Sequence, residues 1–295
     1  MIDILPIHAY VGNRELCIKV AGHFLSRGQL TAMLGAGASR GMGLPDWHTL
    51  VERLIAATGI DDSLDANASP EALMRIVNKV ERAAGVNFLA NVSESLYEDA
   101  REDRALLEQK LLAVLGAMAM GSKRGSIKEV LTFNFDDVFE RYLWLHGFNS
   151  QVITDLPTLR SDVDVTVYHP HGFLPREELP GMSASNEVIL SKYSFDNRLG
   201  QQLNPWQELL RDLLNRKVAL FFGLSTGSPT LMTVLTAMSQ SLASTRGPTG
   251  FWLLGPQDAQ DVDADLIDIN IVPVRMDTYD EFVDFLLAIC RSARH

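Results

Sequence analysis

Cysteine is scarce in this 295-residue sequence, which contains only Cys17 and Cys290. The two lie near opposite ends of the chain, and neither belongs to a C-x-x-C pair. This scarcity excludes a four-cysteine zinc site and makes a disulfide framework implausible. Two reduced thiols in a cytoplasmic protein are the simplest interpretation.

Long apolar runs and basic stretches are also lacking. The most apolar segment, 111–120, is far shorter than the ~20 residues that a membrane-spanning helix needs. The first ten residues show no basic flank followed by a long apolar run, as a secretory signal would. The formal net charge of −11 repels a phosphate backbone, and no basic stripe is visible. We therefore expect a cytoplasmic protein that binds neither membranes nor nucleic acid directly.

The residues that are present suit a globular domain. Hydrophobic residues make up 46% of the chain and charged residues 21%, which allows a sizeable core. Short apolar segments alternate with segments of helical periodicity. The segments expected to form strands are 29–34, 129–134, 163–168, 188–190, 217–222, 251–254 and 269–274. This alternation predicts an α/β fold of Rossmann type, with a mainly parallel sheet flanked by helices.

Residues 48–127 interrupt the alternation of strands and helices. Helical periodicity runs from 48 to 57, a polar loop follows, and 71–120 contains no proline. Leucine, alanine, glutamate and arginine dominate that last stretch, and all are good helix formers. We predict a helical insertion lobe at 48–127 within a single domain that spans 1–295.

Glycine-rich or polar sequences follow four of the predicted strands. These sequences are Gly35–Ser39, Asn134–Asp136, His169–Gly172 and Gly223–Ser228. In a doubly wound sheet, ligands bind beyond the carboxyl ends of the strands. The sequence therefore predicts one crevice where the four exits meet.

The first exit, Gly35-Ala36-Gly37-Ala38-Ser39, admits two interpretations. Its glycines would let the backbone approach a phosphate, and a following helix attracts an anion. Close packing of the strand-to-helix turn would require glycine equally well. Two phosphate-binding patterns do not fit, because no Gly-Lys-Ser/Thr follows and Arg40 replaces the third glycine of the dinucleotide fingerprint.

Together with the downstream Gly43–Trp47, this loop resembles the sirtuin signature G-A-G-x-S followed by G-I-P-D-F. Thr132–Asp136 is similar to the T-Q-N-I-D motif of the same family, with phenylalanine in place of glutamine. His171-Gly172 resembles its H-G motif, and Gly223–Ser225 resembles its G-T-S turn, with leucine in place of threonine. The four motifs occur in the family's order.

The resemblance implies that NAD is the substrate and assigns roles to individual residues. Asn134 would lie beside the nicotinamide ribose, and His171 would act on a ribose hydroxyl or on water. The residues implied to bind NAD are Gly35, Ala36, Gly37, Ser39, Pro45, Asp46, Asp136, Gly223 and Ser225. Without the resemblance, an Asn and an Asp after a strand are typical turn and cap residues. His169 has no family counterpart, and its role stays open between a core histidine and one that supports a neighbour.

Residues 173–289 contain no cysteine, so the zinc ribbon of the family's protein deacylases is absent. This layout resembles the zinc-free bacterial sirtuin-like domains of antiphage defence, as in the Thoeris, short Argonaute and KongMing systems. The resemblance implies an NAD+ glycohydrolase (NADase) that needs no metal and depletes NAD in an infected cell. A partner protein, homo-oligomerisation or a small nucleotide would trigger it. Sensing of NAD or ADP-ribose, a structural role in a defence complex, and ADP-ribosyl transfer stay open as alternatives.

Overall fold

The computed structural model describes residues 3–66, 68–120, 126–159, 161–199, 204–224, 231, 235–236, 247–259 and 262–293. Within these ranges, seven strands form one sheet in the order β3-β4-β2-β1-β5-β6-β7, and every neighbouring pair is parallel. The strands are β1 (Leu30–Leu34), β2 (Glu129–Thr132), β3 (Ser150–Ile153), β4 (Val165–Tyr168), β5 (Val218–Phe222), β6 (Gly250–Leu254) and β7 (Ile271–Arg275). The predicted Rossmann-type α/β class is confirmed.

The observed strands differ from the predicted ones at two places. The prediction omitted β3, an edge strand whose residues Ser150, Gln151 and Val152 are only half-buried. Conversely, 188–190 is not a strand, although its side chains are buried. The backbone N–H of Ile189 instead donates to the carbonyl oxygen of His171 at 2.8 Å. The apolar run at 188–190 therefore reflects burial against a neighbouring loop rather than strand pairing.

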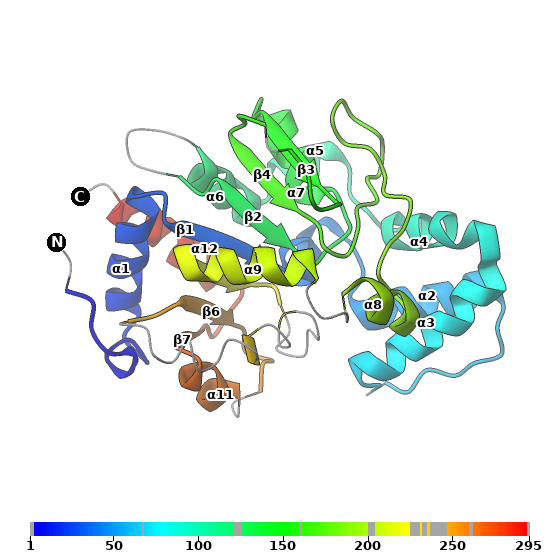
Figure 1. The fold of residues 1–295 in the computed structure, drawn as a ribbon, viewed down its shortest axis with the longest axis horizontal. Helices are drawn as coiled ribbons and strands as arrows, with labels where there is room; N and C mark the ends of the chain where they lie inside the picture. The colour runs from blue at the N-terminus through cyan, green and yellow to red at the C-terminus, as the bar shows by residue number, and fades with distance from the viewer. Residues whose placement is uncertain are drawn as a thin grey trace.

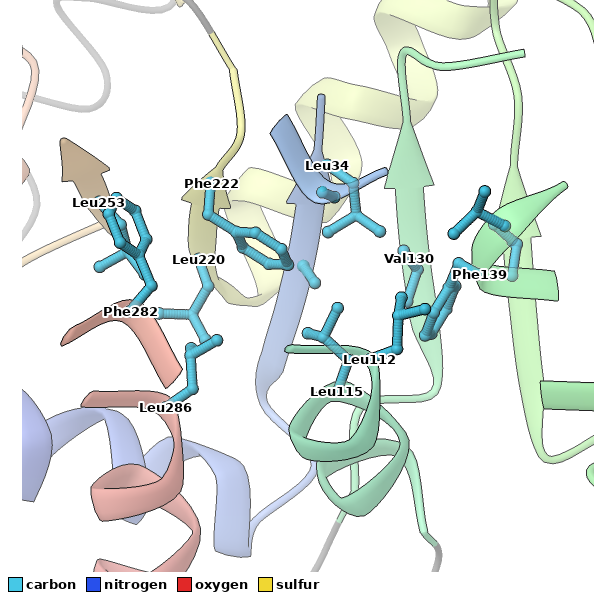
Figure 2. Close-up of a cluster of buried hydrophobic side chains, with 14 of the residues drawn as sticks. Leu34, Leu112, Leu115, Val130, Phe139, Leu220, Phe222, Leu253, Phe282 and Leu286 are labelled. Atoms are coloured by element: carbon cyan, nitrogen blue, oxygen red, sulfur yellow. The ribbon is translucent and has the colours of Figure 1, made fainter. Parts of the chain in front are cut away.

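One face of the sheet is covered by α1 (Arg14–Ser26), α6 (Lys110–Ala119), α7 (Val138–Leu145) and α12 (Asp280–Ser292). Figure 2 shows how these helices meet the sheet: Leu112 and Leu115 of α6 and Phe282 of α12 point toward side chains of the strands. A fully buried leucine or phenylalanine contributes about 1.5–3 kcal/mol to folding. Packing on this face therefore holds the central strands, and with them the loops at their carboxyl ends.

The opposite face is covered by α9 (Pro205–Arg216) and α11 (Val262–Asp268). Successive strand residues point to opposite faces, so Met33 joins this second core while its neighbour Leu34 joins the first. The rings of Phe221 and Trp252 stack across adjacent strands, with their centroids 4.8 Å apart. The sheet is thus a middle layer that is buried on both faces, as parallel sheets require.

A group of helices lies beyond one end of the sheet (Figure 1). It contains α2 (Trp47–Thr58), α3 (Pro70–Ala84) and α4 (Phe88–Tyr97), with α8 (Lys192–Arg198) against α3. Asp46 and Ser69 cap the first two helices by accepting bonds from backbone amides, at 2.9 and 3.2 Å. Within the predicted lobe at 48–127, α2, α3 and α4 pack on one another, whereas α6 packs on the sheet.

Polar contacts attach these helices to the loops of the sheet. The hydroxyl of Tyr97, at the end of α4, lies 2.7 Å from the carbonyl oxygen of Leu174 and accepts a bond from the amide of Asp137 at 3.1 Å. Arg141 of α7 donates to both carboxylate oxygens of Asp103 in the short helix α5 (Asp103–Leu107), at 2.6 and 2.9 Å. These contacts join α4 to the loops after β2 and β4, and α5 to α7. None of the described helices is long and apolar enough to cross a bilayer.

Candidate functional site

The order in which the strands are added to the sheet reverses between β1 and β5. On one side of β1 the sheet continues with β2, β4 and β3, which all precede β5 in the chain, and on the other side it continues with β5, β6 and β7. The position between β1 and β5 is therefore a topological switch point, and a doubly wound sheet carries its binding crevice at such a point. A cavity of about 990 Å³ lies there, between the carboxyl edge of the sheet and residues of α2, α3, α6 and α12.

Most of the residues that the sequence singles out lie on the wall of this one cavity. They are Gly35, Ala36, Gly37, Ser39, Pro45, Asp46, Asn134, Asp136, His171 and Gly223. Ser225 lies outside the described residues, as does most of the helix predicted at 230–242. The loops after β1, β2, β4 and β5 are thus brought together at one site.

The glycines of the first loop make a direct backbone contact with the loop after β5. The N–H of Gly37 donates to the carbonyl oxygen of Gly223 at 3.0 Å. A Cβ atom on Gly35 would lie only 2.3 Å from that same oxygen. Gly223 itself has φ of +66°, a conformation that favours glycine. Packing between the two loops therefore requires these glycines, while Ala36 and Gly37 remain exposed at the cavity.

Asn134, Ser39 and Asp136 form a hydrogen-bonded network between the loops after β1 and β2. Nδ2 of Asn134 donates to the carbonyl oxygen of Gly35 at 3.0 Å and to Oγ of Ser39 at 3.2 Å. Oγ of Ser39 in turn donates to Oδ1 of Asp136 at 2.8 Å, and that oxygen also accepts from the amide of Val138 at 3.0 Å. Among the described residues, the side-chain hydrogen bonds of Asn134 are donated by Nδ2, so Oδ1 remains an available acceptor at the cavity wall.

Burial, together with the nearby carboxylate of Glu140, raises the pKa of Asp136 from 3.8 to about 7. Two hydrogen bonds, from Val138 and Ser39, oppose this shift. Near neutral pH the carboxyl group therefore exists in both protonation states. In its protonated state it is a hydrogen-bond donor as well as an acceptor.

We expect Asp136→Asn to stabilise the protein more at pH 8 than at pH 5. The folded-state pKa lies above the unfolded one, so wild-type stability falls as the pH rises from about 4 through 7, whereas Asn cannot ionise. The melting temperature of the variant relative to wild type should rise by roughly 5–10 °C between the two pH values. About two pH units of differential titration amount to about 2.7 kcal/mol, and each kcal/mol shifts the melting temperature of a chain of this size by about 2–4 °C.

Thermal unfolding followed by circular dichroism measures this difference. Asp103→Asn is the matched control, because pairing with Arg141 lowers the pKa of Asp103 and makes its charge stabilising. That variant should be less stable than wild type at both pH values. A relative melting temperature of Asp136→Asn that is constant or falls with pH would contradict the expected ionisation.

His171 is half-buried on the cavity wall. Burial lowers its pKa to about 4 against a hydrogen bond with the backbone of Phe133, and the electrostatic effect of neighbouring His169 and Arg198 acts in the same direction as burial. Its ring meets that of Phe133 edge to face, with centroids 5.4 Å apart. Gly172 follows with φ of +90°, and a Cβ there would lie 2.4 Å from the carbonyl oxygen of Glu187. The imidazole is therefore held by a tight turn in its neutral form, which can accept a proton.

His169, in contrast, is fully buried and does not line the cavity. Its Nδ1 lies 3.0 Å from the carbonyl oxygen of Asn134, and its Nε2 lies 2.9 Å from Oε1 of Glu140. Of the two roles left open by the sequence, the structure shows a buried histidine that contacts the backbone of a neighbouring candidate site residue.

Several cavity residues were not assigned to the site by sequence reasoning. The basic residues of the described wall, apart from His171, are Arg40 and Lys110, and its far side carries Asp258, Tyr279 and Asp280. Arg40 could have been found, because it directly follows the glycine loop. The others come from segments distant in sequence that carry no motif. No group of three His, Cys, Asp or Glu residues in the described ranges could hold a metal ion.

A comparison with protein families identifies a SIR2-like domain over residues 128–273. The matched range contains strands β2 to β6 and the loops with Asn134, Asp136, His171 and Gly223, whereas the glycine loop after β1 precedes it. A search of curated proteins found no match. The SIR2-like match supports the sirtuin-like interpretation and NAD-related chemistry for this part of the chain.

Proposed function

We propose that the protein is an NAD+ glycohydrolase that releases nicotinamide and ADP-ribose. The observation that carries this proposal is the convergence of Asn134 and His171 on one cavity at the switch point of the sheet. Both residues lie within the range that matches the SIR2-like domain. The glycine loop and Gly223, which resemble the NAD-contacting motifs of sirtuins, lie on the same wall.

Cleavage of the nicotinamide–ribose bond does not require a general acid. The bond between the ribose C1′ and the nicotinamide nitrogen breaks, and its electron pair stays on that nitrogen, which loses its positive charge. The nicotinamide therefore leaves without being protonated. A water oxygen bonds to C1′, and the proton that it loses passes to a base. The site must hold the ribose, stabilise an oxocarbenium-like transition state and position the water.

Each of these tasks matches a residue at the cavity. We assign the base to His171, because burial keeps its imidazole neutral at physiological pH. Oδ1 of Asn134 is the available acceptor that would orient the water or a ribose hydroxyl. Asp46 and Asp136 would contact the nicotinamide side. Ala36 and Gly37, exposed at the cavity, would meet the pyrophosphate with Ser39 supporting the turn, and Gly223 and Ser225 would meet the adenosine side.

The biological role that we propose is NAD depletion as an antiviral response of the abortive-infection kind. It rests on the resemblance to zinc-free sirtuin-like defence domains, together with the lack of cysteine in 173–289. An unregulated NADase would harm its own cell, so we propose that a partner protein, homo-oligomerisation or a nucleotide activates it in the cytoplasm. Full activity of an isolated monomer in size-exclusion fractions would contradict this regulation.

The test is nicotinamide release from NAD by the purified protein, alone and with its genomic neighbour proteins. Asn134→Ala should reduce release by about 100-fold or more, since a lost transition-state contact of this type costs about 2.7–4 kcal/mol. Asn149→Ala is the control, because Asn149 is exposed and lies away from the cavity.

The products separate the alternatives. Free ADP-ribose supports hydrolysis, whereas a cyclic product or ADP-ribose attached to protein would replace hydrolysis by cyclisation or transfer. Binding of NAD without release of nicotinamide in any combination would overturn the proposal in favour of a sensor. Absence of both binding and release would favour a structural subunit.

A further inference from the structure

The buried histidine His169 connects three elements that surround the cavity. It follows β4 and lies two residues before His171 in the same loop. Its Nδ1 contacts the carbonyl oxygen of Asn134 after β2, and its Nε2 contacts Glu140 of α7. The side chains of His169 and Glu140 are 0% and 1% exposed, so water does not replace either contact.

The two contacts determine where the protons of this pair lie. A carbonyl oxygen only accepts hydrogen bonds, so Nδ1 must carry a hydrogen and donate it to Asn134. Nε2 faces a carboxylate oxygen at 2.9 Å, and a single proton lies between them. The ring of Phe173 packs edge to face against the imidazole, with centroids 4.7 Å apart. Both the tautomer and the orientation of the ring are therefore fixed.

The fixed ring also determines how two loops lie relative to each other. Backbone bonds hold His169 in its own loop: its N–H donates to the carbonyl oxygen of Ile153 at 2.8 Å, and its carbonyl oxygen accepts from Gly172 at 3.0 Å. Because the same residue binds Asn134, the loop that carries His171 and the loop that carries Asn134 share one anchor. Neither contact reaches the cavity itself.

We propose that His169 and Glu140 are a positioning pair, which holds the backbone of Asn134 so that its amide and the imidazole of His171 meet the same ribose. The inference rests on the proposed NAD cleavage and adds two residues to it. A buried ionisable pair often gives a fold no more stability than apolar side chains of similar volume. Orientation of the site therefore accounts for this pair better than stability does.

Steady-state kinetics of NAD cleavage on Glu140→Gln, His169→Asn and His169→Phe test the inference. We expect kcat to fall about tenfold or more in Glu140→Gln and about 100-fold in His169→Phe, since a misplacement of ~1 Å costs about that much, with KM for NAD changed less than twofold. His169→Asn keeps a donor near the position of Nδ1, so it should recover part of the kcat that His169→Phe loses.

Glu129→Gln is the matched control. Glu129 also belongs to a buried ion pair, with Lys217 at 2.7 Å, but it begins β2 at the edge of the sheet opposite the cavity. It should lose stability, as the site variants do, while its kcat per folded molecule stays within twofold of wild type. Unchanged kcat in Glu140→Gln and His169→Phe, or an equal fall in Glu129→Gln, would overturn the inference.

Amide hydrogen exchange distinguishes a failure of this inference from a failure of the proposed function. Exchange in residues 133–138 should accelerate at least tenfold in Glu140→Gln and His169→Phe but not in Glu129→Gln. If wild-type protein releases no nicotinamide, the proposed function fails, and accelerated exchange still shows that the pair holds the Asn134 loop. Unaltered exchange overturns the positioning role whatever the activity. If His169→Phe does not fold, Glu140→Gln, which preserves side-chain volume, carries both measurements.

Discussion

His171→Ala should lower kcat for NAD cleavage by about 10²–10⁴-fold, the usual contribution of a positioned base. The variant loses the neutral imidazole on the cavity wall, while the turn that holds it depends on Gly172 and is retained. Nicotinamide release under saturating NAD measures the effect. His8→Ala provides the control, because His8 is exposed and does not line the cavity. Near-wild-type kcat in His171→Ala would remove the base from the proposed mechanism.

The pH dependence of kcat tests the same assignment independently. A base with a pKa of about 4 becomes protonated only near and below that pH. On the acid side, kcat should therefore fall near pH 4 rather than near 6.5, the ordinary pKa of histidine. The pKa of Asp136 is about 7, and any change of kcat near pH 7 that its ionisation causes should disappear in Asp136→Asn. A fall of kcat near pH 6.5 that persists in Asp136→Asn would contradict the lowered pKa of His171.

Gly223→Ala should destabilise the fold by about 3 kcal/mol or more, because it combines a strained backbone with a steric clash. Its φ is +66°, and the added Cβ would lie 2.5 Å from the amide nitrogen of Ala38 and 2.9 Å from the carbonyl carbon of Gly37. These are backbone atoms, so the clash is relieved only if one loop moves away from the other. Unfolding by urea, followed by circular dichroism, measures the change in the free energy of unfolding.

Gly59→Ala measures the backbone strain alone, so the difference between the two variants gives the steric part of the effect. Gly59 ends α2 with φ of +64°, almost the same as at Gly223, but an added Cβ there meets nothing within 4 Å. It should cost about 1 kcal/mol, the penalty for the left-handed conformation alone. If Gly223→Ala costs no more than Gly59→Ala, the contact between the two loops is not what requires glycine.

Much of the fold could be predicted because its central strands are buried on both faces. All five residues of β1 and of β5 are buried, so both strands are almost entirely apolar, with Thr31 as the polar exception. The edge strand β3 has no such signal, since its outer face is solvated and its first residues are Ser150 and Gln151. The segment 188–190 has the opposite property, an apolar run without strand pairing. A short apolar run therefore indicates burial but not strand pairing.

Site residues near the ends of strands could be predicted, whereas those positioned by tertiary packing could not. Asn134 and His171 lie in the loops that follow β2 and β4, so the topology of a parallel sheet brings them to one edge, where the structure places both on the cavity wall. Glu140 and His169 are 29 positions apart, and no spacing rule connects a helix residue to a strand exit at that separation. Lys110 and Asp280 reach the wall from α6 and α12 only because these helices pack on the sheet. Tertiary packing, rather than local sequence, positions these residues.

The backbone contact between the loops after β1 and β5 has a thermodynamic consequence for ligand binding. Gly35 and Gly37 donate to the carbonyl oxygens of Phe222 and Gly223, so the turn at 35–39 is ordered together with the central strands of the sheet. Its conformational entropy is lost when the chain folds, and little remains to be lost when a ligand arrives. A dinucleotide would therefore meet a preorganised rim at this edge, and more of its contact energy would appear as affinity.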